Sequence, residues 1–174
     1  MTADVRHAIQ AYTARSAITS SSMRGSAAGA IPAARDFLSE LPLGPFGTTS
    51  RSKFSTQLDR ATDRLLTKLP KKARHWGRAR KALNIFLRGC LYTSYLRDEH
   101  GLGQAEDFFE VPLDSITGVR LFEASRGALP SWTTVRDLDR EKSEKYQSVA
   151  GAIAAPQGIA RVHLDAVWWG RRDE

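Results

Sequence analysis

Lys81 and Asp114 are residue types that together can act on an electrophilic carbon. Lys81 lies beside Arg78 and Arg80 in an apolar segment. Because burial and like charges both disfavour an ammonium ion, we expect a lowered pKa for Lys81 and a free amine that can attack. Asp114 stands where a helix N-cap belongs, so backbone N–H groups would hold its carboxylate as an anion. Such an anion opposite an amine can orient the attack and stabilise a developing cationic sugar.

Other kinds of reactive site find little support in the sequence. The four histidines are scattered, and no ligand-spaced pair that would bind zinc accompanies them: His7, His75, His100 and His163. No glycine-rich phosphate loop and no Gly-x-Ser-x-Gly elbow is present. Cys90, the only cysteine, is expected to be a buried and unreactive thiol. We therefore predict no metal and no cofactor.

The segment from Arg78 to Leu96 must position Lys81, because it is the longest stretch that is both apolar and helix-favouring. At helical spacing one broad face is apolar, and it consists of Ala79, Ala82, Leu83, Phe86, Leu87 and Cys90. A helix that is apolar over so much of its circumference belongs at the centre of a core. The lysine lies in its first turns.

The other segments also favour helices, so we predict a mainly helical, all-α fold. The expected helices are Asp4 to Ser16, Pro32 to about Leu41, a helix capped by Ser52 or Ser55 and ending at Leu69, Ser115 to Ala124, a helix opened by Asp139 or Ser143 and running through Ile153, and Ile159 to Trp169. The segment Phe108 to Leu113 is expected to be extended, since Pro112 disfavours helix for the residue before it. Few segments alternate with period two, so strands are at most minor.

The length and composition indicate one globular domain, with 41% apolar and 26% charged residues. We expect residues 1–31 to form a helix and a flexible Ser/Ala-rich arm, and residues 32–174 to form a single helical domain. No apolar run approaches the roughly 18 residues of a membrane span, so no membrane partner is expected. We predict a cytoplasmic, nucleoid-associated monomer.

Positive charge is concentrated in one part of the chain. The segment from Arg51 to Arg88 holds twelve Lys and Arg against two acids, Asp59 and Asp63, so its net charge is +10. The whole chain has a net charge of +7, which leaves about −3 for the rest of the chain. A basic block on an otherwise acidic chain is typical of a polyanion-binding face. A solvated helix surface is the alternative.

Within the basic block, Leu69 to Gly77 connects two expected helices in a helix-hairpin-helix-like unit. This hairpin, then Lys-Ala-Leu-Asn-Ile-Phe-Leu-Arg, then Glu-Val-Pro-Leu-Asp-Ser-Ile-Thr-Gly-Val-Arg-Leu, resembles the helix-hairpin-helix DNA glycosylase superfamily. The resemblance covers about Leu69 to Leu121. It is strongest to the archaeal-type 8-oxoguanine DNA glycosylases and to small bacterial 8-oxoguanine-glycosylase-like proteins. It implies a compact helical bundle with an active-site cleft.

The resemblance also implies roles for Lys81 and Asp114, which are 33 residues apart. Lys81 would attack C1′ of a flipped nucleotide and form a Schiff base, and Asp114 would help to activate Lys81 and stabilise the oxocarbenium-like state. The partner would be double-stranded DNA with a damaged or modified base, 8-oxoguanine being favoured.

A flipped base also needs a stacking pocket. The candidates for this pocket are Trp76, Trp132, Trp168 and Trp169, with Asp165 as an acceptor for a base edge. Core packing is the alternative for each tryptophan, and a surface position is the alternative for Asp165.

The hairpin departs from the Leu-Pro-Gly-Val-Gly sequence that is usual in that superfamily, because Lys71 and Lys72 follow Pro70 here. Side chains would then have to contact DNA in place of backbone amides. The predicted DNA-binding residues are Lys71, Lys72, Arg74, Arg78 and Arg80.

Three functions are compatible with these residues. The first is a bifunctional DNA glycosylase and AP lyase. The second is a non-catalytic basic helical DNA-binding module, for example in genome defence. The third is a helical protein-interaction domain. Borohydride trapping on lesion-bearing DNA would indicate the first function. Salt-dependent DNA binding without cleavage would indicate the second, and no retention on DNA at moderate salt would indicate the third.

Overall fold

The computed structural model describes residues 2–170, with the side chains of residues 169 and 170 excepted, and no strand occurs within that range. The predicted all-α class is therefore confirmed. Short 3₁₀ turns separate the helices, which are α1 (Ala3–Ala17), α2 (Ala30–Ser39), α3 (Arg51–Lys68), α4 (Trp76–Tyr92), α5 (Ser94–Glu99), α6 (Ser115–Ala124), α7 (Arg140–Ala154) and α8 (Leu164–Gly170). None of the described helices is long and apolar enough to cross a membrane.

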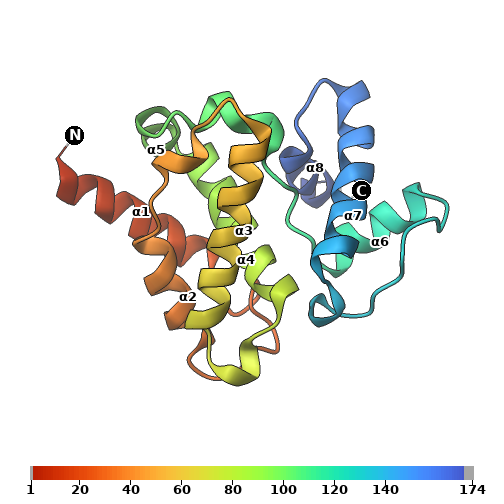
Figure 1. Ribbon diagram of the computed structural model, residues 1–174, viewed down its shortest axis with the longest axis horizontal. Coiled ribbons are helices and arrows are strands. Elements are labelled where there is room, and N and C mark those ends of the chain that lie inside the picture. The colour runs from red at the N-terminus through yellow and green to blue at the C-terminus, as the bar shows by residue number, and fades with distance from the viewer. Residues whose placement is uncertain (1, 171–174) are drawn as a thin grey trace.

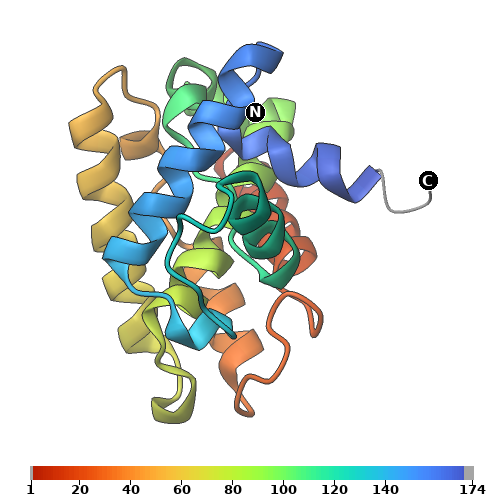
Figure 2. The ribbon, with the colours of Figure 1, turned by 90° about the vertical axis from the view of Figure 1, so that its right-hand side faces the viewer.

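The helices fall into two groups with separate apolar cores (Figure 1). Helices α1 to α5 surround the larger core, which includes Phe46, Phe54 and Phe86. Helices α6 to α8 surround the smaller core, which includes Leu121 and Tyr146. Figure 2 shows that, within the second group, α8 points away from α7 toward the C-terminus. The segment between α5 and α6 connects the two groups.

Helix α4 is central to the first core, as its sequence predicts. Phe86, Leu87 and Cys90 are at most 1% exposed, and burial raises the pKa of the Cys90 thiol. The prediction of one helix to Leu96 was too long. Thr93 adopts an extended conformation, with φ −88° and ψ 106°, so the chain turns there and α5 buries Leu96 separately.

The N-terminal segment belongs to the first core. Helix α1 packs against α2 and α4, and Ala14 and Ile18 are fully buried. The Gln10 side-chain amide donates to the carbonyl oxygens of Leu38 and Leu41 at 2.9 and 2.8 Å. The Ser/Ala-rich segment after α1, which was expected to be a flexible arm, contributes the buried Met23 to the same core. Residues 2–31 are thus continuous with the domain that was expected to begin at residue 32.

Helices α3 and α4 form the expected helical hairpin. Helix α3 buries the predicted stripe, with Phe54, Leu58 and Leu65 at most 2% exposed. Its N-cap is Ser50, whose hydroxyl accepts from the Lys53 backbone at 3.4 Å, so the expected caps at Ser52 and Ser55 were wrong.

Helix α4 begins close to the segment that follows α6. A Cβ at Gly77 would lie 2.2 Å from the Val135 carbonyl oxygen, so only glycine permits this approach.

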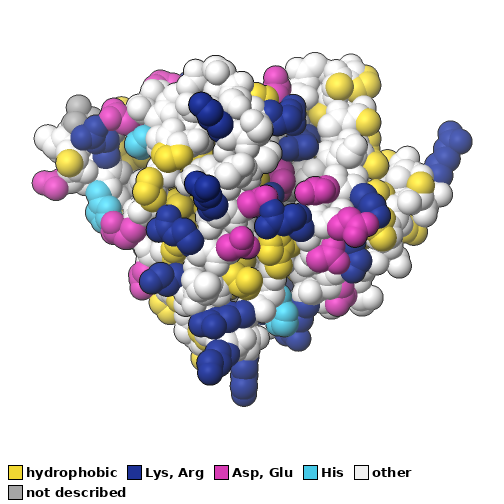
Figure 3. Space-filling view, in the orientation of Figure 1, with side chains coloured by type: hydrophobic (Ala, Val, Ile, Leu, Met, Phe, Trp, Pro, Cys, Tyr) yellow, Lys and Arg dark blue, Asp and Glu magenta, His cyan; other side chains and the backbone are white. Residues whose placement is uncertain are grey.

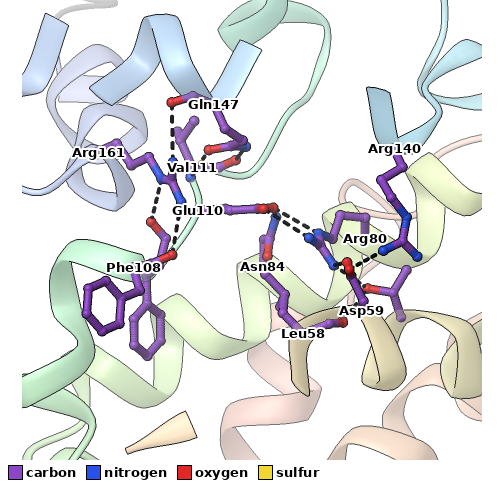
Figure 4. A network of polar contacts seen from close by, with 12 residues as sticks. Leu58, Asp59, Arg80, Asn84, Phe108, Glu110, Val111, Arg140, Gln147 and Arg161 are labelled. Atoms are coloured by element: carbon purple, nitrogen blue, oxygen red, sulfur yellow. Dashed lines mark hydrogen bonds and ion pairs between the residues drawn. The ribbon is translucent and has the colours of Figure 1, made fainter. Parts of the chain in front are cut away.

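Side chains from three helices hold the segment Phe108 to Val111 between the two cores (Figure 4). The Gln147 side chain pairs with both backbone groups of Val111 at 2.8 and 3.0 Å. The Arg161 guanidinium donates to the carbonyl oxygens of Phe108 and Phe109, both at 3.0 Å. The extended segment was predicted to begin at Phe108, but Phe108 ends the 3₁₀ turn Leu102–Phe108, and the backbone is extended only from Phe109, with φ −60° and ψ 142°. From there the chain leads directly to the start of α6. Fixation of this segment therefore sets the position of Asp114.

Candidate active site

A cavity of about 550 Å³ brings together residues from both groups of helices. Lys81 enters it from α4, Asp114 from the start of α6, and Asp165 from α8. Helix α1 and the loop after it, with Ser21 and Ser22, form another wall. Two residues 33 apart in sequence, and a third 51 residues further on, thus share one site.

Lys81 is half-buried in this cavity and makes no ion pair within residues 2–170, so every described carboxylate oxygen is more than 4.0 Å from its Nζ. Burial lowers the pKa of Lys81, and the charges of Arg24 and Arg78 act in the same direction. The carboxylates of Asp114 and Asp165 oppose this effect but do not cancel it. The neutral amine is therefore favoured relative to an ordinary lysine, as the sequence predicted.

Asp114 is the N-cap of α6, also as predicted. Its Oδ1 accepts hydrogen bonds from the backbone N–H groups of Ile116 and Thr117 at 3.0 and 2.9 Å. These bonds fix the carboxylate at the cavity wall as a hydrogen-bond acceptor. Both Asp114 and Lys81 line the cavity, and they do not form an ion pair with each other.

Asp165 is 5% exposed, so it is not the surface carboxylate that was the alternative. It pairs with Arg88 of α4, and the Thr117 hydroxyl donates to its Oδ1 at 3.4 Å. Burial raises the pKa of Asp165, and Arg88 counteracts this. Asp165 therefore lines the same cavity as Lys81, and its charge acts on the amine while its oxygens are held by Arg88 and Thr117.

Two exposed tyrosines at the cavity were not among the sequence candidates. Tyr12 and Tyr92 line it and are 66% and 50% exposed. The Tyr92 hydroxyl lies 2.9 Å from Nδ1 of His163, whose Nε2 lies 2.6 Å from a Glu106 oxygen. Tyr12 was missed because α1 was assigned to a separate arm. Tyr92 was missed because only tryptophans were considered as stacking residues.

None of the three tryptophans with described side chains lines this cavity. Trp76 packs under Arg80, whose guanidinium carbon is 5.2 Å from the ring centre. Trp132 fills the space above Gly118, where a Cβ would lie 2.3 Å from the ring, and borders a separate cleft of about 300 Å³. Trp168 packs against the second core. Trp132 and Trp168 thus pack against the second core, Trp76 packs against Arg80, and the side chain of Trp169 lies outside the described part of the chain.

The basic connection between α3 and α4 exposes Lys71, Lys72 and Arg74. Arg74 also donates to the carbonyl oxygens of Leu69 and Thr67 at 2.9 and 2.8 Å, which caps the end of α3. Figure 3 shows Lys and Arg side chains gathered at the lower end of the molecule, where Figure 1 places this connection. These three residues remain candidates for contact with a polyanion.

Arg78 and Arg80 are interior residues, only 6% and 7% exposed, which removes them from the predicted exposed surface. Arg80 donates to both carboxylate oxygens of Glu110 at 2.9 and 3.0 Å, and to Asp59 at 3.0 Å (Figure 4). The charged block was read as one face, but helical geometry turns these two arginines inward. Arg80 neutralises Glu110, which the sequence reading had not paired with it.

Comparison of the chain with protein-family models, curated proteins and solved structures gives no match.

Proposed function

We propose that this protein is a DNA N-glycosylase with AP-lyase activity that removes a damaged or modified base, with 8-oxoguanine the favoured substrate. The observation that carries the proposal is the cavity that Lys81 shares with Asp114 and Asp165, in which the lysine has no ion-pair partner among the described residues. An amine with a lowered pKa beside a fixed anion is the arrangement that attack on C1′ of a nucleotide requires. The resemblance around Lys81 and Asp114 favours the same reaction.

In this mechanism the neutral Lys81 amine attacks C1′ as the bond from C1′ to the base breaks, and the base leaves with a proton. Asp114 stabilises the positive charge on the sugar, and the amine then loses a proton. Opening of the sugar ring gives a Schiff base between Nζ and C1′. Loss of a proton from C2′ then expels the 3′ phosphate by β-elimination. Asp165 is the proposed acceptor or donor for protons in these steps.

Borohydride trapping tests this function, because hydride reduces the Schiff base to a stable secondary amine. We expect a covalent complex between the protein and a duplex that contains 8-oxoguanine, and its loss in Lys81→Gln. Lys53→Gln removes an exposed lysine on α3 and should trap at a rate within a few-fold of wild type. Undiminished trapping by Lys81→Gln would rule out Lys81 as the nucleophile. Trapping on another lesion would retain the mechanism and change the substrate.

A non-catalytic DNA-binding module is the second candidate, since the exposed Lys71, Lys72 and Arg74 could hold phosphates without any chemistry in the cavity. This function predicts salt-dependent binding to duplex DNA, with a slope set by the number of phosphates contacted. It also predicts that no lesion-bearing duplex is trapped or cleaved. The two measurements together separate the candidates.

A further inference from the structure

Arg78 is a buried cation whose charge is not balanced by a carboxylate. Its side chain is 6% exposed, and its Nη2 donates to the Gly25 carbonyl oxygen at 3.1 Å. Its Nη1 is buried and has no hydrogen-bond partner among the described residues. Burial lowers the pKa of Arg78, and the nearby charge of Arg136 lowers it further. A donor on a charged group that is left unpaired in this way is costly.

Two further arginines lie near the loop between α1 and α2, which contains Gly25. Arg136 also donates to the Gly25 carbonyl oxygen, at 3.0 Å, so two guanidinium groups share one acceptor. Arg24 precedes Gly25 and is close enough to Lys81 to help lower its pKa. Within residues 2–170, none of Arg24, Arg78 and Arg136 forms an ion pair with an acid. Arg78 and Arg136 thus share one acceptor, Arg24 is the residue next to it in the chain, and no described carboxylate pairs with any of the three.

A second unpaired donor follows Gly25 directly. The Ser26 hydroxyl is buried and, like Arg78 Nη1, has no hydrogen-bond partner among the described residues. Gly25 connects the two donors, since its carbonyl oxygen accepts from Arg78 and Ser26 is the next residue in the chain. Two buried donors and two exposed arginines are the groups that bind a tetrahedral oxyanion.

We infer that Arg24, Ser26, Arg78 and Arg136 form an oxyanion site that takes a phosphodiester group of the nucleic acid strand. The same loop contributes Ser21 and Ser22 to the wall of the Lys81 cavity, so the bound phosphate would flank the nucleotide that enters it. This assignment of the ligand rests on the proposed function, whereas the oxyanion site itself does not. Arg24 and Ser26 lie on the loop after α1, Arg78 on α4 and Arg136 in the 3₁₀ turn Val135–Asp137, so the site differs from the basic connection between α3 and α4.

Inorganic phosphate tests the site without DNA. Thermal unfolding is measured in phosphate and in chloride at equal ionic strength, for wild type and for Arg24→Ala/Arg136→Ala, since both side chains are exposed. We expect phosphate to raise the Tm of wild type by about 2 to 4 °C more than that of the double variant. The matched control is Lys53→Ala/Arg60→Ala, which loses the same charge on α3 and should respond as wild type does. An equal rise in all three proteins would reflect only the general stabilising effect of phosphate and would overturn the site.

Neutral methylphosphonate linkages then test the ligand. Binding is measured to a series of duplexes that contain an uncleavable abasic analogue. In each duplex a different phosphodiester linkage beside the analogue is replaced by a neutral methylphosphonate. At the contacted position, wild type and the Lys53→Ala/Arg60→Ala control should lose about tenfold in affinity, whereas Arg24→Ala/Arg136→Ala should lose nothing further. Equal sensitivity of the double variant at every position would refute the phosphodiester assignment. Neither measurement involves Lys81 chemistry, so loss of borohydride trapping alone would count only against the proposed activity.

Discussion

Replacement of Glu110 by glutamine tests whether the buried ion pair with Arg80 holds the two cores together. The pair is bidentate, and the two side chains are 10% and 8% exposed. The Asn84 amide donates to the same carboxylate at 2.9 Å. Glutamine keeps the shape of the side chain but leaves the Arg80 charge without its main partner. Since removal of one member of a buried pair costs about 3 to 5 kcal/mol, we expect Glu110→Gln to lower the free energy of unfolding by about 3 kcal/mol.

The acid limb of the stability curve gives an independent check. Burial alone would raise the pKa of Glu110, but the Arg80 charge and its hydrogen bonds outweigh burial and hold that pKa below its usual range. A carboxyl group with a lowered folded-state pKa contributes stability above its unfolded-state pKa, and that contribution is lost as the pH falls through the folded-state value. The difference between wild type and Glu110→Gln should therefore shrink toward low pH.

Urea titration with linear extrapolation measures both effects. Asp59→Asn is the matched control, because Asp59 also pairs with Arg80 but is 27% exposed. This change should cost only about 1 kcal/mol. The ion pair does not hold the Phe108 to Val111 segment if two results are found together. Glu110→Gln would lower the free energy of unfolding by no more than Asp59→Asn does, and the difference between wild type and Glu110→Gln would not change with pH. Arg80→Met with Glu110→Leu should recover much of the loss, since the buried Arg80 charge is then absent and Asp59 keeps its ion pair with Arg140.

Substitutions at three further positions, with a control at Gly151, follow from the same structure. Lys81→Met should raise the free energy of unfolding by about 1 kcal/mol near neutral pH, because the half-buried ammonium has no ion-pair partner among the described residues. The folded-state pKa of Lys81 is lowered, so this gain should decline as the pH rises from that value to the unfolded-state value, which urea titrations at several pH values would show. Asp114→Ala should cost about 1 kcal/mol through loss of the N-cap, whereas Asp114→Asn should keep the cap and still lose borohydride trapping. Gly77→Ala should cost about 2 kcal/mol because its Cβ would meet the Val135 carbonyl oxygen, while Gly151→Ala, on α7 with open space, should be neutral or stabilising by thermal unfolding.

Local signals in the sequence predicted the elements whose causes are local. Asp114 caps α6, and the stripe of Phe54, Leu58 and Leu65 faces the core, because both depend on side chains a few residues apart. The break at Thr93 was not predictable in the same way. Apolar spacing continues through it to Leu96, and the turn arises because α5 packs back against α4.

Charge in the sequence was a weaker guide than apolar spacing. Arg78 and Arg80 count toward the basic block, yet both are buried, and their partners come from distant segments. Glu110 lies 30 residues from Arg80, and Gly25 lies 53 residues from Arg78. Composition also gave no sign of the contacts of the N-terminal segment, in which Ala14, Ile18 and Met23 are buried in the first core. Tyr12 at the cavity is the functional consequence of that packing.

The environment of Lys81 depends on how its two neighbouring carboxylates are already engaged. Asp114 accepts two backbone hydrogen bonds at the start of α6, and Asp165 pairs with Arg88 and accepts from Thr117. If either carboxylate paired directly with Lys81, its charge would raise the pKa of the amine and make it a poorer nucleophile. The α6 backbone and Arg88 therefore hold the two anions near the amine without allowing either to neutralise it. Burial then determines the direction of the shift, and the amine is left available to a substrate in the cavity.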